Sequence, residues 1–114
     1  MRRLSLATAI FAIVLLYGFP ARARNRHATI AGYIGDSMCG LRHGHGRTTQ
    51  EQDRDCTLQC VKDGSRFILA DRAARKVYEL DDQEAPRRFA GEKVQVTGEI
   101  DGNTVRVETI EKAR

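Results

Sequence analysis

The sequence contains no tryptophan, and its 114 residues include only three tyrosines and four phenylalanines. So few large side chains predict one small domain with a modest apolar core, and domains of that size often need a disulfide or a metal ion as well. Cysteine, which could supply either, occurs only three times. Because three cysteines cannot all pair within one chain, at least one thiol needs another role.

Several motifs that indicate enzymes are also missing. The sequence has no phosphate-binding glycine loop, no Gly-x-Ser-x-Gly nucleophile elbow and no paired-carboxylate pattern beyond scattered acids. Their absence favours a binding or structural protein, although it does not exclude an enzyme.

The first residues have the pattern of a secretory signal peptide. Arg2 and Arg3 precede an apolar run over residues 4–19, and residues 21–23 (Ala-Arg-Ala) provide the small residues of a cleavage site. The apolar run is short for a membrane span, which needs about 20 residues. We therefore predict a cleavable signal peptide at residues 1–23, with an uncleaved anchor as the alternative.

Cleavage after Ala23 leads to further expectations. The mature protein would carry 16 basic side chains against 15 acidic ones, which is too little positive charge for a domain that binds nucleic acid. It would be secreted or periplasmic, without a membrane segment, in a compartment that permits disulfides. Residues 24–27 are expected to form a flexible mature N-terminus, and residues 28–112 a single domain.

Short strands dominate the expected secondary structure. Residues 93–100 ("KVQVTGEI") alternate apolar and polar side chains with period two, and "DGN" after them can form a tight turn. A helix is expected from Asp53 to Asp63, because Asp53 or Asp55 can cap its start and Gly64 can end it. The expected strands are residues 28–36, 66–71, 76–80, 93–100 and 104–110, with a brief helix at residues 82–90.

This order of elements predicts a mainly β fold. We expect a small five-stranded, OB-like barrel with a Cys/His loop and helix inserted between strands 1 and 2, and a short helix between strands 3 and 4. Closing the sheet would remove unpaired strand edges. An open β-meander with two helices packed on it is the alternative.

Several segments resemble an uncharacterised family of small exported bacterial proteins. They are "GYIGDSMCGLRH", "CTLQCVKDGSRFILA", "KVYEL" and "FAGEKVQVTGEIDGNTVRVETIE". In that family a Cys-Gly-x-x-His element and a Cys-x-x-x-Cys element precede an OB-like β half. The resemblance covers nearly the whole mature chain, and it implies export and the fold but no activity.

Cys56 and Cys60 are four residues apart, so on a helix their Cβ atoms lie about 5–6 Å from each other on one face. A disulfide needs Cβ atoms roughly 3.5–4.5 Å apart, whereas two thiolates on a tetrahedral zinc ion have sulfurs about 3.8 Å apart. The pair therefore fits a bridging metal better than a covalent bond. Leu58 and Val61, on the opposite face, are expected to contact the core.

Cys39 and His43 repeat the four-residue spacing in the preceding loop. With Cys56 and Cys60 they form a set of three cysteines and one histidine, which is a structural zinc combination, and soft thiolates also suit Cu(I). We therefore predict that these four residues bind zinc or copper, and His45 could replace His43. The expected partner is a metal ion, with another exported protein or a small ligand as further candidates.

Two alternatives use the same thiols. A disulfide from Cys39 to Cys56 or Cys60 would close a loop of about 20 residues, worth roughly 3 kcal/mol, and would leave one thiol over. In the other, Cys56 lies in the first turn of the expected helix, where the helix dipole lowers a thiol pKa, and it acts in redox chemistry with Cys60. The spacing leaves all three hypotheses open.

Overall fold

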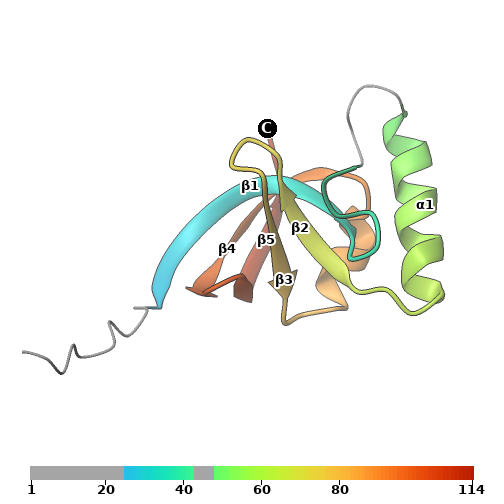
Figure 1. Ribbon diagram of the computed structural model, residues 1–114. Helices are drawn as coiled ribbons and strands as arrows, with labels where there is room; N and C mark the ends of the chain where they lie inside the picture. Colours follow the sequence, from blue (N-terminus) through green and yellow to red (C-terminus); the bar gives the residue numbers. More distant parts are fainter. Residues whose placement is uncertain (1–24, 43–47) are drawn as a thin grey trace, which may run out of the picture.

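The protein folds as a closed five-stranded barrel with one α-helix beside it (Figure 1). The computed structural model describes residues 25–42 and 48–114, so the predicted signal peptide lies outside the described residues. The elements are β1 (Arg26–Asp36), η3 (Gly40–Arg42), α1 (Gln50–Lys62), β2 (Phe67–Asp71), β3 (Lys76–Leu80), η4 (Ala85–Phe89), β4 (Lys93–Asp101) and β5 (Thr104–Lys112). None of the helices in the described part is long and apolar enough to cross a membrane.

The strand order around the barrel is β1-β2-β3-β5-β4, and β4 returns to pair with β1. Every neighbouring pair is antiparallel except β3 with β5, which is parallel. This arrangement confirms the predicted mainly β, five-stranded barrel with a helix between the first two strands. The strand boundaries agree with the sequence prediction to within about two residues.

Inward-facing apolar residues from all five strands fill the barrel. The core cluster consists of Ile30, Ile34, Phe67, Leu69, Tyr78, Leu80, Ala90, Val94, Val96, Ile100, Val105 and Ile110. The expected alternation in residues 93–100 is present, since Val94, Val96 and Ile100 are buried. The cluster comes from the strands and the β3–β4 connection, and Leu58 and Val61 pack against it from the helix.

The long strand β1 joins two ladders. Its residues 33–36 pair with β2, and residues 26–33 pair with β4. Gly32 lies at the change of partner, where an added Cβ would be only 2.7 Å from the Ala70 carbonyl oxygen. Gly32 therefore allows a close approach of two strands, which a side chain would prevent.

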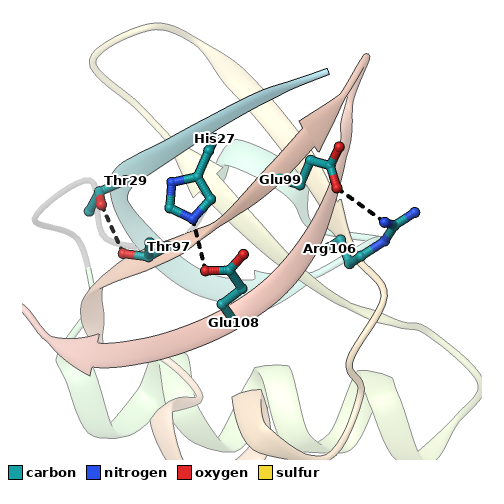
Figure 2. Close-up of polar contacts among 6 residues, drawn as sticks. All are labelled: His27, Thr29, Thr97, Glu99, Arg106 and Glu108. Atoms are coloured by element: carbon teal, nitrogen blue, oxygen red, sulfur yellow. Dashed lines mark hydrogen bonds and ion pairs between the residues drawn. The ribbon is translucent and has the colours of Figure 1, made fainter. Parts of the chain in front are cut away.

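Polar pairs on the outer face of the barrel match the register of β1, β4 and β5 (Figure 2). The Thr29 and Thr97 hydroxyls share a hydrogen bond of 2.8 Å across β1 and β4. His27 Nε2 lies 2.8 Å from a Glu108 carboxylate oxygen. These contacts are exposed, so they favour the register without adding much stability.

The side chain of Gln83 takes the place of a strand at the start of β2. Its Oε1 accepts from the Phe67 N–H at 2.8 Å, and its Nε2 donates to the carbonyls of Phe67 and Leu80, both at 3.0 Å.

We expect Gln83→Leu to lower the free energy of unfolding by about 1–3 kcal/mol, because backbone groups of a buried residue lose their partners. Urea denaturation measures the loss, and Glu84→Leu at the exposed neighbouring position should cost less than half as much.

Candidate metal site

A tight turn fixes Cys39 at the end of β1. Asp36 is fully buried, and one of its carboxylate oxygens accepts from the N–H groups of Met38 and Cys39, both at 3.0 Å. Gly40 follows with a φ of 54°, and the Arg42 N–H then donates to the Cys39 carbonyl at 3.1 Å to form η3. Because backbone bonds on both sides hold Cys39, its side chain has a defined direction.

The helix α1 carries the other two cysteines and begins earlier than the sequence predicts. Thr49 is its N-cap: the Thr49 hydroxyl accepts from the Gln52 N–H, and the Gln52 side chain accepts from the Thr49 N–H. This capping box replaces the predicted cap at Asp53 or Asp55, so the predicted helix start was wrong by three residues. The helix ends at Lys62, just before Gly64 as predicted.

The face of α1 that meets the barrel is more polar than expected. Asp53 and Thr57 are its buried residues, whereas Leu58 and Val61 are only half-buried against the core. Asp53 accepts a hydrogen bond of 2.6 Å from the Thr48 hydroxyl, which explains how a carboxylate is accommodated there. Cys60 lies next to this buried face, so its sulfur borders the helix–barrel contact, whereas Cys56 is exposed.

Gly91, between η4 and β4, sets the position of the helix. Its φ is 76°, and an added Cβ would lie 2.6 Å from the backbone nitrogen of Arg54 and 3.0 Å from the carbonyl oxygen of Gln50. The Arg54 guanidinium also donates to the Arg88 carbonyl at 3.3 Å. The first turns of α1 therefore rest directly on the backbone of the β3–β4 connection.

These elements bring all three cysteines together. The Sγ atoms of Cys39, Cys56 and Cys60 lie within 4.8 Å of one another. Sulfurs bound to one tetrahedral ion are about 3.8 Å apart, so small side-chain rotations would bring them to that separation. Cys39 and Cys60 are half-buried, while Cys56 is exposed. The arrangement can offer three thiolates to one soft metal ion from the side of the barrel.

The surroundings of the cluster favour neutral thiols. Desolvation and the nearby Asp36 carboxylate raise the pKa of Cys39. The same two causes, followed by the charges of Cys56 and Cys39, raise the pKa of Cys60 to about 12. Negative charge is therefore costly among these sulfurs, and a cation would relieve that cost.

The predicted site residues fall into two groups. Cys39, Cys56 and Cys60 converge as the sequence spacing suggested, and Asp36 acts as a turn cap beside them. His43, the predicted fourth ligand, and its alternative His45 lie outside the described residues. The assignment of the four residues as metal ligands stays a prediction.

The redox hypothesis loses its main physical argument. Because α1 begins at Gln50, Cys56 lies in the second turn, and the effect of a helix dipole falls off within the first turn. The raised pKa of Cys60 also opposes formation of a thiolate. The disulfide hypothesis keeps its geometric basis, since Cys39 lies near both helix cysteines.

Comparison with known families gives one match. The family described as "Protein of unknown function (DUF5818)" matches residues 61–113, from the end of α1 through β5. The chain is thus similar to that family over β2–β5, and the matched region does not include the three cysteines. Neither the curated proteins nor the solved structures that were compared with the chain gave a significant match.

Proposed function

We propose that the protein is an exported binding or structural module that holds one zinc or copper ion. Cys39, Cys56 and Cys60 would supply thiolates, and His43 would supply a ring nitrogen as the fourth ligand. The observation that carries the proposal is the approach of three sulfurs from two separate elements to within 4.8 Å.

The chemistry of the donors supports a soft or borderline ion. Thiolates select zinc and Cu(I) over hard ions such as magnesium or calcium, which prefer oxygen ligands. The bound ion would link the η3 segment to α1, which contacts the barrel mainly through β1. Because the apolar core lies within the barrel, the ion would fix the helix rather than complete the core.

Export also belongs to this proposal. It rests on the basic start, the apolar run and the small residues within residues 1–23. An exported site would meet zinc and copper outside the reducing cytosol, and its thiols would then be exposed to oxidation. The resemblance to small exported proteins with paired Cys/His elements points to the same location.

Metal binding by single-cysteine variants tests the proposal. Cys39→Ser, Cys56→Ser and Cys60→Ser should each weaken the affinity by more than the roughly 10–100-fold that loss of an outer-shell partner costs. Competition against a chromophoric chelator measures the affinity, and native mass spectrometry counts the bound ions. His27→Ala is the matched control, since this exposed histidine lies on the outer face of β1 and should have no effect.

The outcomes separate the proposal from its alternatives. A metal adduct that is lost on acidification, together with similar losses for Cys56→Ser and Cys60→Ser, supports the metal site. Full affinity in either helix variant contradicts the four-ligand arrangement. A metal-free protein lighter by two hydrogens, with one titratable thiol, indicates the disulfide from Cys39. A readily exchanging disulfide indicates a redox protein.

A further inference from the structure

The first half of β1 has an open edge on the side that faces β2. The Ile34 N–H donates to the Glu92 carbonyl, just before β4, at 3.1 Å. The Ser37 N–H donates to the Arg66 carbonyl, just before β2, at 2.9 Å. Backbone groups alternate in direction along a strand, so those of Thr29 and Ala31 point to the β2 side. Their pairing with β4 does not use these groups, and no backbone bond joins them to another of the described residues 25–42 and 48–114.

The strand β2 is too short to reach this edge. Its pairing with β1 stops at Tyr33 and Ala70, and the chain turns into β3 after Asp71. In Figure 1 the first half of β1 continues past the β2–β3 hairpin. Residues 29 and 31 therefore present a short row of backbone donors and acceptors, which is the feature that an added strand recognises.

Two adjoining hollows run along this edge. One, of about 470 Å³, lies between β1 and the hairpin, with Ile30, Ala74 and Tyr78 among its walls. The other, of about 270 Å³, continues toward Tyr33 and Lys93. They share Ala31, Asp71 and Ala73 and contain none of the three cysteines. Together they form a continuous groove, defined here as the β1-edge groove.

The charges around the β1-edge groove are mostly positive. Arg26 lines one hollow, and Arg72 and Lys93 line the other. The Arg72 guanidinium lies 3.8 Å above the centre of the Tyr33 ring, which fixes it at the wall. Asp71 is the acidic residue of the lining, and its carboxylate accepts from the Ala74 N–H within the hairpin turn.

We propose that the β1-edge groove binds an extended acidic peptide segment of a partner protein as an additional strand. The backbone groups at positions 29 and 31 would pair with the peptide backbone, and acidic side chains would meet Arg26 and Lys93. A second copy of this chain would bring the same positive charges against the groove, which opposes self-pairing. A nucleic acid would meet the charges, but its phosphates offer no N–H donors to the carbonyls of β1.

A synthetic peptide that alternates glutamate and valine over seven residues is the probe. Its binding to the protein should shift the backbone amide signals of Thr29 and Ala31 in nuclear magnetic resonance spectra and should weaken with added salt. N-methylation of alternate peptide nitrogens should lower affinity about tenfold in one register and leave it nearly unchanged in the other. This pattern arises because only one edge of the peptide pairs with β1.

Variants of the protein test the same contact. Ala31→Pro removes the N–H that points into the groove and spares the pairing with β4, so affinity should fall about tenfold, whereas Ala31→Ser should keep it. Lys93→Glu should weaken binding, and its effect should vanish at high salt. Cys39→Ser should bind the peptide normally, which separates this proposal from the metal site.

Three results with the peptides would overturn the proposal. They are equal binding of a lysine–valine peptide, equal loss in both N-methylated registers, and amide shifts confined to surfaces other than the β1-edge groove. Tighter binding of a single-stranded oligonucleotide at the same amides would assign the groove to nucleic acid instead. A folded Ala31→Pro variant with full affinity would exclude strand addition at this edge.

Discussion

Zinc affinity is expected to fall by at least about 100-fold for each unit by which the pH is lowered from 8 to 6. A bound thiolate must first lose its proton, and two of the thiols have a raised pKa, with that of Cys60 at about 12. Each proton displaced contributes about a factor of ten per pH unit. Chelator competition at a series of pH values measures the slope.

The raised pKa of Cys60 also predicts the pH range in which zinc affinity keeps changing with pH. Ordinary thiols ionise near pH 8.5, so their contribution would vanish above that value. At about pH 9–10 metal binding should still displace a proton from Cys60. In Cys60→Ser the change in zinc affinity over this range should therefore be smaller by about a factor of ten per pH unit. An affinity that is constant between pH 8 and 6 would contradict thiolate binding altogether.

The metal-free protein provides an independent check of the same pKa. A thiol whose pKa is higher in the folded state stabilises the fold fully below its unfolded pKa, and this contribution is lost as the pH rises toward the folded value. For Cys60 the window extends from about pH 9 to about pH 12. Unfolding free energies should therefore decline through this window more in the parent protein than in Cys60→Ser.

The β half of the fold followed from the sequence because its signals are local. Period-two alternation in residues 93–100 specifies which side chains face the core, and the glycine-containing turn after them specifies the hairpin. The brief helix before β4 is present as η4, and the Asp82 carboxylate, two residues before the N-cap Glu84, accepts from the Glu84 and Ala85 N–H groups. Those bonds lower the pKa of Asp82.

The helix was predicted less accurately because its packing depends on tertiary contacts. Apolar side chains at helical spacing predict that Leu58 and Val61 contact the core, which they do, but the more deeply buried position is Thr57. The sequence signal for the start of the helix is the Thr-x-x-Gln pattern of a capping box, which begins at Thr49. This pattern precedes the helically spaced apolar residues, so their spacing alone does not reveal it. Which face of α1 is buried depends on the barrel surface beneath the helix, and the helix sequence alone does not specify that surface.

The candidate site was also predictable only in part, because one of its features is local and the other depends on tertiary contacts. The spacing of Cys56 and Cys60 places them on one helix face from sequence alone, whereas their approach to Cys39 depends on the turn after β1. That turn is made by the buried Asp36 carboxylate, whose structural role a lone acidic residue in a sequence does not reveal. The raised thiol pKa values follow from this carboxylate and from burial, so they too required the fold.

Replacing Gly91 with alanine is expected to destabilise the protein by about 2–5 kcal/mol and to displace α1. The left-handed backbone conformation costs an alanine about 1–2 kcal/mol, and the Cβ would also overlap the helix backbone at Arg54, at a further cost of about 1–3 kcal/mol. Urea denaturation measures the total. Because α1 carries two of the proposed ligands, zinc affinity should fall as well.

Gly102→Ala is the matched control for this effect. Gly102 has a φ of 60°, but an added Cβ would have no atom within 4 Å, so this variant should show only the backbone cost. The difference in unfolding free energy between the two variants isolates the contact of α1 with the barrel. Equal destabilisation, with unchanged zinc affinity in Gly91→Ala, would mean that the helix can shift without disturbing the sulfurs.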